Sequence, residues 1–431
     1  MGGVPRSGAR APPRLTPLGA VEGVSVLTPS LLAELQTAAG ERALTAAAEV
    51  LGTEPDFLRA AQQVARMVPE RLARAAVEQV LLRRRAQVKF DGAADLFFTR
   101  EGLEQATATA VARHRAERFA GFPQAFDLGC GIGGDTLELA RVTDVVGVDL
   151  DRLRLNVLVA NAERTGAASR IRPVLADLER LPLRFPRDAA AFVDPGRRAG
   201  GRRLRGVDTY HPPLRLVLSW RSSVAGLAIK VSPAVRLEEV RDLGCEIEFV
   251  SLGGELKEAV LWFGALRRGR RRATVLPAGV SMEGEAEPAA QLGPLASFLI
   301  EPDPAVMRAG LVQQLGAEFG AYPIARDIAF LTKDEPLFSP FARTYRVVQA
   351  APFRLKSLQR MLAERGVGRL TVKRRGSAVE PDDISRRLHL TGDREALVVL
   401  TRIAERQTMI LAEPVYSAKG ADEQNKSTAL P

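Results

Sequence analysis

Between residues 125 and 266, short apolar runs of β-prone residues alternate with helical segments, and this alternation constrains the fold more than any other feature of the chain. The β-prone runs are 125–128, 144–150, 171–175, 190–194, 226–231, 246–252 and 259–266. Strands that alternate with helices form a parallel sheet covered by those helices. The last two runs flank Gly253 and Gly254, which predicts an antiparallel hairpin closing the edge of the sheet. We therefore expect a doubly wound α/β domain over 119–276.

The segments on either side have a different texture. At 431 residues, the chain is too long for a single hydrophobic core, so several domains are expected. Apolar residues recur at three- and four-residue steps over 27–118, which predicts a helical N-terminal domain. Proline, glycine and arginine dominate 1–26, and small polar residues dominate 414–431, so both ends are predicted to be disordered tails.

A proline-, glycine- and alanine-rich stretch follows the sheet domain. We expect residues 277–294 to form a linker or long loop. Beyond it, helical and extended patterns mix without an internal repeat. They predict a small α+β module of the ferredoxin-like kind over 295–348 and a second α+β module over 349–413.

The charge of the chain is compatible with a polyanionic partner. Its 61 basic and 51 acidic residues give a formal net charge of +10, and such a balance attracts nucleic acids over long range. Arginine also outnumbers lysine, as a GC-rich coding sequence would produce. The charge alone therefore leaves both explanations open.

Neither a metal centre nor a membrane segment is predicted. The cysteines Cys130 and Cys245 and the three histidines do not fall at the short spacings of a zinc site. Residues 1–20 lack the apolar run of a signal peptide, and no stretch approaches the roughly 18 apolar residues of a membrane helix. We expect a cytoplasmic protein.

A glycine-rich turn follows the first predicted strand. The strand ends in Asp127, and the chain continues through Gly129, Gly131 and Gly133 into a helical segment. Glycines let the backbone bend tightly and approach a ligand, and the following helix presents unpaired N–H groups. Asp149 ends the next strand, where a carboxylate can accept hydrogen bonds from two ribose hydroxyls. These features fit both a nicotinamide dinucleotide and S-adenosylmethionine.

Asp127 distinguishes the two cofactors. A carboxylate at this position would repel a pyrophosphate, whereas it would attract the amino group of a methionine. The run Asp-Leu-Gly-Cys-Gly-Ile-Gly from Asp127 to Gly133 resembles the first motif of class I S-adenosylmethionine-dependent methyltransferases, which have a Rossmann-like fold. The resemblance implies S-adenosylmethionine as the cofactor, with the glycines beside its methionine, Asp149 at its ribose and Asp177 near its adenine amine.

The fourth predicted strand ends in Asp194, which is followed by Pro195, Gly196 and Arg197. In methyltransferases of this class, that position lies beside the methyl donor and the target atom. Those that methylate amino groups of nucleic acids carry Asp/Asn-Pro-Pro-aromatic there, and this chain departs from that pattern at the third and fourth positions. Asp194, with Pro195 beside it, could orient the acceptor or its proton, and Arg197 and Arg198 could hold a phosphate. A turn with solvated arginines is the alternative.

No cysteine follows the fifth predicted strand, where the sequence over 230–233 is Lys-Val-Ser-Pro. Methylation of a pyrimidine at C5 requires a cysteine nucleophile near the methyl donor. The sequence therefore favours direct in-line transfer to nitrogen or oxygen, in which the chain contributes proximity and orientation.

Basic and aromatic residues interleave just before the sheet domain. Arg83–Arg85 could meet phosphates, and Phe97 and Phe98 could stack on a base. Core packing explains the two phenylalanines equally well.

Segments 301–310, 353–356 and 366–376 resemble bacterial methyltransferases that carry a C-terminal THUMP-like domain. The resemblance covers roughly 27–413 and implies that 349–413 is the THUMP-like domain. Because THUMP domains in general bind structured RNA, it also implies an RNA substrate. Two alternatives remain: the same chemistry on a protein or small molecule, and a non-catalytic RNA-binding protein with a vestigial cofactor site.

Overall fold

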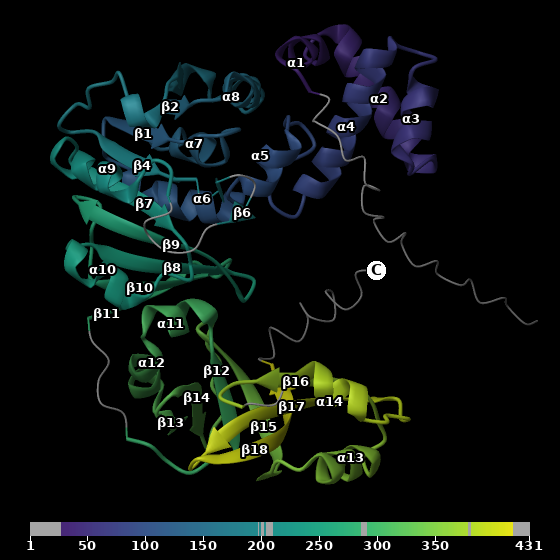
Figure 1. The fold of residues 1–431 in the computed structure, drawn as a ribbon, viewed down its shortest axis with the longest axis vertical. Coiled ribbons are helices and arrows are strands. Elements are labelled where there is room, and N and C mark those ends of the chain that lie inside the picture. The colour runs from purple at the N-terminus through teal and green to yellow at the C-terminus, as the bar shows by residue number, and fades with distance from the viewer. Residues whose placement is uncertain are drawn as a thin grey trace, which may run out of the picture. The chain divides into compact units, whose positions relative to one another are not determined.

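The computed structural model describes residues 27–196, 198–199, 202–203, 210–285, 291–377 and 381–416. These residues form two compact units (Figure 1). The first unit spans Ser25–Gln291 and Pro302–Ala321, and the second spans Leu292–Glu301 and the chain from Tyr322 onwards. The segments 1–26 and 417–431, which belong to the predicted tails, lie outside the described residues, and so does Arg197. None of the described helices is both long and apolar enough to cross a membrane.

The first unit begins with a group of helices, in the segment where the apolar spacing predicts them. They are α1 Pro29–Leu35, α2 Ala38–Thr53, α3 Phe57–Val64, α4 Glu70–Ala86, α5 Arg100–Gln105 and α6 Thr109–Ala116. α1 to α4 lie together in Figure 1. The side chains of Thr28, Thr37 and Asp56 each accept a backbone N–H at the start of α1, α2 and α3. Each cap satisfies one of the free donors at a helix N-terminus.

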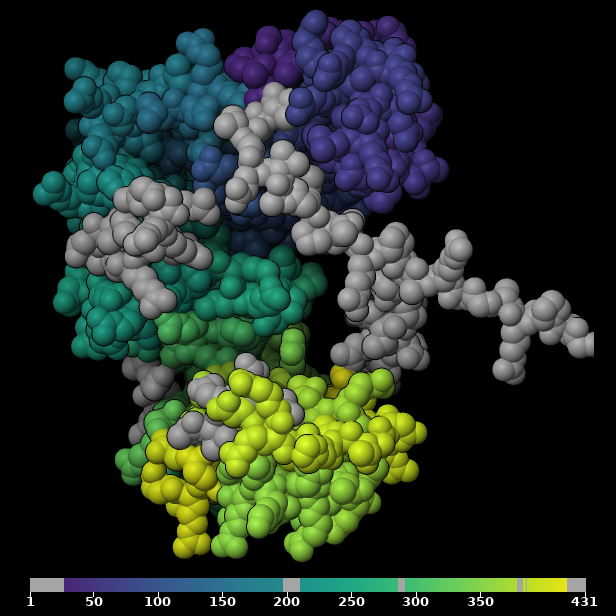
Figure 2. Space-filling view, turned by 45° about the vertical axis from the view of Figure 1, so that its right-hand side comes forward, coloured from purple at the N-terminus to yellow at the C-terminus, as the bar shows by residue number. Residues whose placement is uncertain are grey.

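Phe97 and Phe98 join the helical segment to the sheet domain, whose surfaces adjoin in Figure 2. Both rings are fully buried, so they pack in the core and offer no face to a base. Asn161 accepts a hydrogen bond from the N–H of Phe97 at 2.7 Å and donates one to its carbonyl oxygen at 3.0 Å. The structure therefore supports the core-packing interpretation of these residues.

Within the run Arg83–Arg85, two of the three side chains bind the protein's own backbone. Arg83 Nε donates to the carbonyl of Leu96 at 2.8 Å, and Arg84 Nη1 donates to the carbonyl of Leu51 at 3.0 Å. Burial lowers the pKa of Arg83 to about 10. These two guanidinium groups hold the helical segment together.

Nine strands form the sheet of the first unit. They are β1 Gln124–Leu128, β2 Asp144–Asp149, β3 Ile171–Leu175, β4 Ala190–Val193, β7 Gly226–Val231, β8 Glu246–Leu252, β9 Glu255–Gly264, β10 Arg271–Leu276 and β11 Val280–Gly284. Their order across the sheet is β11-β10-β8-β9-β7-β4-β1-β2-β3. The five strands from β3 to β7 in this order are parallel, as predicted. The connecting helices include α7 Gly134–Leu139, α8 Arg152–Arg164, α9 Leu214–Ser219 and α10 Leu237–Val240, and the short strands β5 Arg198–Ala199 and β6 Arg202–Arg203 form a separate ribbon.

The sheet does not end where the sequence predicts. β8 and β9 form the expected antiparallel hairpin, but β9 inserts between β7 and β8, so the hairpin is not the edge. β10 pairs in parallel with β8, and β11 adds the edge strand inside the predicted linker 277–294. β10 was not predicted because its arginines interrupt the apolar pattern of a buried strand. The side chain of Arg272 is nevertheless buried, since it forms an ion pair with Glu246.

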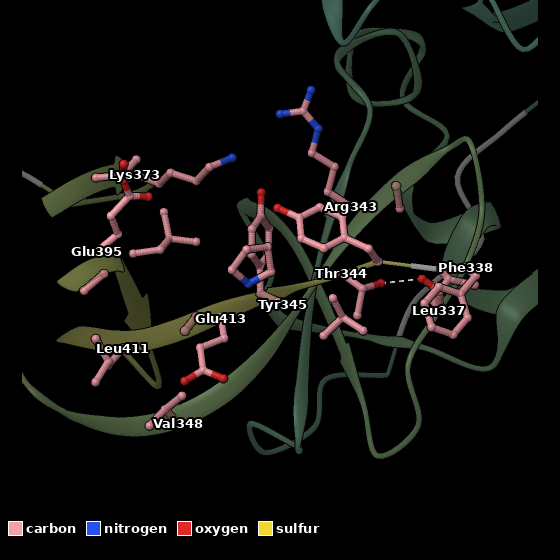
Figure 3. Close-up of a pocket in the computed structure, with 18 of the residues that line it drawn as sticks. Leu337, Phe338, Arg343, Thr344, Tyr345, Val348, Lys373, Glu395, Leu411 and Glu413 are labelled. Carbon is pink, nitrogen blue, oxygen red and sulfur yellow. Dashed lines mark hydrogen bonds between the residues drawn. The ribbon is translucent and has the colours of Figure 1, made fainter. Parts of the chain in front are cut away.

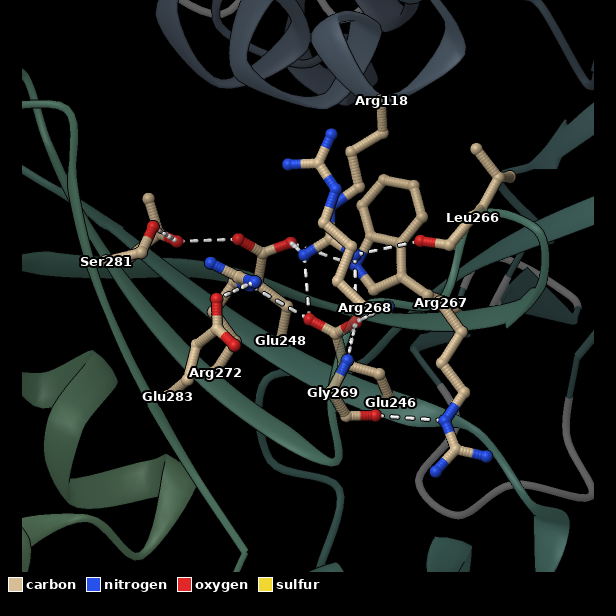
Figure 4. Close-up of polar contacts among 12 residues, drawn as sticks. Arg118, Glu246, Glu248, Leu266, Arg267, Arg268, Gly269, Arg272, Ser281 and Glu283 are labelled. Carbon is tan, nitrogen blue, oxygen red and sulfur yellow. Dashed lines mark hydrogen bonds and ion pairs between the residues drawn. The ribbon is translucent and has the colours of Figure 1, made fainter. Parts of the chain in front are cut away.

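The core beneath β8 to β10 contains a network of buried charges (Figure 4). Glu246 and Glu248 are fully buried, and Arg118 Nη2 lies 2.8 Å from Glu246 Oε1 and 3.1 Å from Glu248 Oε2. Burial alone would raise the pKa of both carboxyls. At Glu246, the hydrogen bond and charge of Arg118 lower the pKa more than burial raises it. At Glu248, His114 and Arg118 together do the same, so both pKa values lie at about 2. The two carboxylates are therefore charged and depend on their partners.

Replacing Arg118 by methionine should destabilise the first unit by about 3–5 kcal/mol, because two buried carboxylates would lose their main partner. Unfolding in urea can be followed by tryptophan fluorescence, since both tryptophans, Trp220 and Trp262, lie in this unit. Arg236→Met is the control, because the side chain of Arg236 is 73% exposed and its loss should change stability by less than about 0.5 kcal/mol. Equal stabilities of the two variants would contradict the prediction.

The second unit is built on one seven-stranded sheet. Its strands are β12 Phe298–Pro302, β13 Tyr322–Ala325, β14 Ile328–Lys333, β15 Ala342–Pro352, β16 Val367–Arg374, β17 Arg394–Ile403 and β18 Arg406–Val415, in the order β13-β14-β12-β15-β18-β17-β16. The helices α13 Leu355–Ala363 and α14 Pro381–Arg387 belong to this unit, whereas α11 Pro304–Ala309 and α12 Val312–Phe319 belong to the first.

A single sheet thus runs through both of the modules predicted at the C-terminus. The predicted boundary between 348 and 349 falls inside β15, which pairs with β18 along most of its length. The pairing is long-range in sequence, so a local pattern of helices and strands could not reveal it. The α/β fold class with an α+β C-terminal region is nevertheless confirmed.

Candidate functional site

The carboxyl ends of the parallel strands border a cavity of about 750 Å³. Strands β1 to β4 run in the same direction, so the residues that follow them meet at one edge of the sheet. Six predicted site residues line the cavity: Gly129, Gly131, Asp149, Asp177, Asp194 and Pro195. Asp127 and Gly133 do not belong to its lining, and Arg197 lies outside the described residues.

The glycine turn has a backbone that other residues would adopt only under strain. Gly129 and Gly133 have φ of +94° and +96°, in the left-handed region that favours glycine. A Cβ on Gly133 would lie 2.5 Å from Leu158 Cδ1, and one on Gly129 would lie 3.2 Å from the carbonyl oxygen of Asp194. A Cβ on Gly131 would meet nothing within 4 Å. The turn therefore packs closely on the protein at two glycines and faces open space at the third.

Asp149 is held by backbone N–H groups. Its Oδ2 accepts a hydrogen bond from the N–H of Gly131 at 2.9 Å, and its Oδ1 accepts one from the N–H of Asp151 at 2.9 Å. The side chain is mostly buried but borders the cavity. Each carboxylate oxygen can accept a further hydrogen bond, so the group suits a ligand with two adjacent hydroxyls.

Asp127 lies behind the turn, buried at the end of β1. Thr136 Oγ1 donates a hydrogen bond to its Oδ2 at 2.5 Å, whereas its buried Oδ1 has no hydrogen-bond partner among the described residues. Burial raises the pKa of Asp127 to about 7, although the Thr136 hydrogen bond and the charge of Arg115 act in the opposite direction. A cationic group near the turn would favour the charged carboxylate.

Lys230 is a site residue that the sequence analysis missed. It occupies the end of β7, next to β4, and its Nζ lies 2.6 Å from Asp194 Oδ2 and 3.3 Å from Thr107 Oγ1. The parallel register pairs Val193 of β4 with Ile229 of β7. The next residues, Asp194 and Lys230, therefore lie side by side. Pairing Asp194 with Lys230 required knowing that β4 and β7 are neighbours in the sheet, which the sequence alone does not show.

The segment that contains α5 forms another wall of the cavity and contributes Glu101, Glu104 and Thr107. Lys89 Nζ anchors the end of α5 by donating to the carbonyl of Leu103 at 2.7 Å and to that of Glu104 at 3.1 Å. Burial, with the nearby charge of Lys230, lowers the pKa of Lys89 to about 8. The helical N-terminal segment thus contributes directly to the site.

The donor set fits S-adenosylmethionine. Asp149 ends β2, and Asp177 and Asp194 lie just beyond the ends of β3 and β4, around a glycine turn that faces open space at Gly131. The buried Oδ1 of Asp127 accepts no hydrogen bond from the described residues. A ligand with a sulfonium, an amine and two ribose hydroxyls complements such a site, whereas the pyrophosphate of a dinucleotide would meet like charge. In addition, β9 lies antiparallel between β7 and β8, which departs from the dinucleotide-binding strand order.

Comparison with known proteins decides the family. A protein of Mycobacterium tuberculosis, known in strains H37Rv and CDC 1551 as an uncharacterized S-adenosylmethionine-dependent methyltransferase, is 36% identical over 340 residues. The match covers 76% of this chain and 92% of the relative. The chain belongs to the S-adenosylmethionine-dependent methyltransferases. The predicted enzyme class and cofactor are thereby confirmed.

Three segments of this methyltransferase match known families. Residues 125–193 match the family described as a methyltransferase domain, residues 342–414 match the one described as THUMP domain-like, and residues 29–86 match a domain of unknown function. A crystal structure from Porphyromonas gingivalis W83, described provisionally as a methyltransferase, is 18% identical with a TM-score of 0.69. That match covers 85% of this chain and 98% of the other, so the two share a fold.

Within the described part of the chain, no group of three or more His, Cys, Asp or Glu side chains is placed to hold a metal ion. S-adenosylmethionine is the cofactor of this methyltransferase.

Asp149→Asn should weaken the binding of S-adenosylmethionine about 10-fold to 100-fold, because hydrogen bonds to a charged group contribute about 1.5–3 kcal/mol. Calorimetric titration measures this, with Asp151→Asn as the matched control, since Asp151 is exposed and does not line the cavity. Similar affinities for Asp149→Asn and the wild type would remove Asp149 from the cofactor site.

Asp127→Asn should change how stability depends on pH. The pKa of Asp127 is about 7 in the folded protein and about 3.9 in an unfolded chain. Between these values the folded state keeps a proton that the unfolded state releases, so the free energy of unfolding falls as the pH rises from about 4 to 7. The variant should lack this decline and be more stable than the wild type at pH 8, by an amount on the order of a few kcal/mol.

Urea unfolding at pH 5 and pH 8 tests this expectation, and Asp151→Asn should retain the pH dependence of the wild type. The same Asp127→Asn variant should bind S-adenosylmethionine more weakly, since it loses the carboxylate that would attract a cation. A variant as pH-dependent as the wild type would contradict the assigned pKa shift.

Proposed function

We propose that this methyltransferase transfers a methyl group to a nitrogen or oxygen atom of RNA by direct in-line transfer, and that the THUMP-like unit docks structured RNA. The observation that carries the proposal is a cavity of about 1010 Å³ in the second unit (Figure 3). Its lining includes four basic side chains, Arg343, Arg365, Lys373 and Arg394, and three aromatic ones, Phe338, Tyr345 and Tyr416. Basic groups bind phosphates and aromatic rings stack on bases, so this combination suits RNA.

The aromatic rings at this cavity differ in exposure. Phe338 is 53% exposed and Tyr416 is 49% exposed, whereas Tyr345 is almost buried. Tyr345 donates a hydrogen bond to Glu301 at 2.8 Å, and Lys373 lies 5.1 Å from the centre of its ring. Phe338 and Tyr416 are therefore available for stacking, and Tyr345 helps to hold Lys373 at the cavity wall. The acidic residues Glu395 and Glu413 also line it, so the basic excess is moderate.

Direct transfer is supported by the state of the cysteines. Cys130 borders the cofactor cavity, but burial raises the pKa of its thiol well above the usual value. A protonated thiol is a poor nucleophile. Cys245 is buried at the start of β8 and does not line this cavity. A covalent cysteine intermediate, as C5 methylation needs, therefore has no suitable group among the described residues of the site.

The proposed roles follow the positions of the residues around the cavity. Asp149 would bind the ribose, Asp177 the adenine amine, and Asp194 with Pro195 the acceptor. The glycines Gly129 and Gly131 would border the methionine, with Gly133 shaping the turn and Asp127 attracting the amino group from behind it. When bound, S-adenosylmethionine supplies an already activated methyl group, so the chain contributes position and proton removal. Arg197 remains a predicted phosphate ligand.

The test is transfer of tritiated methyl groups to total RNA from cells that lack the protein. Incorporation should disappear after ribonuclease treatment, and RNA binding should weaken as salt rises, because phosphate contacts release counterions. Incorporation that survives ribonuclease would assign the activity to a protein or small molecule instead. Tight RNA binding without transfer to RNA would indicate a non-catalytic RNA-binding protein.

The docking role of the second unit can be tested separately. The double substitution Phe338→Ala, Arg343→Ala should weaken RNA binding about 10-fold or more, since one stacked base contributes about 1–3 kcal/mol, and should leave the affinity for S-adenosylmethionine unchanged. Arg360→Ala on α13 is the control, because its side chain is 77% exposed and lies outside this cavity. Unchanged RNA affinity in the double variant would contradict the assigned docking surface.

A further inference from the structure

The ion pair of Asp194 and Lys230 retains hydrogen-bonding capacity toward the cofactor cavity. A lysine ammonium has three N–H donors. Lys230 directs one to Asp194 Oδ2 and a second to Thr107 Oγ1, which leaves the third available. Asp194 is 32% exposed, and its Oδ1 accepts no hydrogen bond from the described residues. One cavity wall therefore offers a donor and an acceptor side by side.

A buried chain of contacts keeps Lys230 in place. The hydroxyl of Thr107 donates to Asp135 Oδ2 at 2.8 Å, so its oxygen lone pair is free to receive Lys230. Asp135 is in turn paired with Arg115, whose guanidinium carbon lies 4.3 Å from the centre of the Phe192 ring. Lys230 is 16% exposed. Contacts from α6, α7 and the loop before α6 therefore fix the position of its ammonium, which is not the case for a mobile lysine on the surface.

The described side chains around this pair carry mostly negative charge. The cavity lining also contains Glu101, Glu104 and Glu179, and the cation Arg154 is already paired with Glu101 at 3.2 Å. Carboxylates repel phosphate. Among the described lining residues, this wall therefore favours an uncharged group, such as a base edge, over a phosphate.

We propose that Lys230 and Asp194 form a paired donor and acceptor that binds a nucleobase edge, and that the methyl group is added to a proton-bearing nitrogen of that edge. The inference rests on the proposed function, because it takes RNA as the substrate. Suitable edges place an N–H beside a hydrogen-bond acceptor, as the amine and ring nitrogen of adenine or cytosine do, and as the N–H and carbonyl of guanine or uracil do.

The transfer step balances with these two residues. The nitrogen lone pair forms the new N–C bond while the C–S bond breaks and leaves its electron pair on sulfur. The proton displaced from the nitrogen passes to Oδ1 of Asp194. Lys230 donates to the neighbouring acceptor atom of the base and keeps Asp194 oriented. Asp194 and Lys230 would both touch the substrate, and Lys230 is an addition to the predicted catalytic residues.

The first experiment identifies the methylated nucleoside after digestion of RNA labelled by the wild type. A base methylated at a proton-bearing nitrogen is expected, whereas a 2′-O-methyl group, a C-methyl group or methylation of a ring nitrogen without a proton would overturn the inference. Asp194→Asn should lower kcat about 100-fold or more, as loss of a proton acceptor does. Lys230→Met should raise KM for RNA and lower kcat, while its affinity for S-adenosylmethionine stays close to that of the wild type.

Two controls separate a contact with the base from a structural role. Lys257→Met makes the same change at an exposed lysine outside the cavity and should leave both kinetic constants unchanged. Lys230→Arg keeps the charge but moves the donors. Full activity in Lys230→Arg would mean that the residue only neutralises Asp194, and would overturn the assignment of a donor to the base.

A second experiment does not depend on RNA methylation. Adenosine, cytidine, guanosine and uridine are titrated against the protein loaded with S-adenosylhomocysteine, and binding is followed by saturation-transfer NMR. At least one nucleoside should bind to the wild type, and its form methylated at the proton-bearing nitrogens should bind about 10-fold more weakly. The variants Lys230→Met and Asp194→Asn should bind both forms with similar affinity. If no nucleoside binds, or the variants discriminate like the wild type, the inference fails.

The two experiments distinguish the two proposals. Methylation of RNA together with a failed nucleoside titration would leave the proposed function standing and overturn the base-edge inference. Discrimination among nucleosides without transfer to RNA would refute RNA as the substrate and support the recognition pair.

Discussion

The parallel alignment of β2, β1, β4 and β7 is the constraint on which the site depends. Each strand ends at the same edge of the sheet, so residues separated by more than a hundred positions in sequence meet around one cavity. This alignment brings Asp149, Asp194 and Lys230 to the same cavity. The glycine turn after β1 then keeps the middle of that edge free of side chains, since its left-handed glycines follow the protein closely and leave room for a ligand.

Several arginines of the chain are used inside the fold. Arg115 and Arg118 are buried against carboxylates, and Arg83 donates to a backbone carbonyl. Arg308 of α11 similarly donates to the carbonyls of Pro233 and Val235 in the first unit. Removing one partner from such a pair leaves a buried charge without compensation, which is costly. The net charge of +10 is therefore a weak guide to the surface that meets a substrate.

The cofactor cavity and the cavity of the second unit differ in electrostatic character. The cavity of the first unit carries several carboxylates and suits a cationic methyl donor. The cavity of the second unit has an excess of basic side chains and exposed aromatic rings. Among the described lining residues, the second cavity therefore favours a phosphate backbone more than the first does. This difference supports the proposed division between docking of RNA on the second unit and methyl transfer in the first.

The sequence by itself determined the elements whose signals are local. The glycine turn, Asp127 and Asp149 could be recognised because a strand, a tight turn and a helix follow one another within a short stretch, and the alternation of strands and helices implied the doubly wound sheet. Order across the sheet is different, because pairing partners are chosen by contacts between distant segments. Only the tertiary structure therefore revealed the insertion of β9, the strands β10 and β11, the single C-terminal sheet and the pairing of Lys230 with Asp194. It also decided that Phe97 and Phe98 belong to the core, since burial depends on what packs against a residue and not on the residue alone.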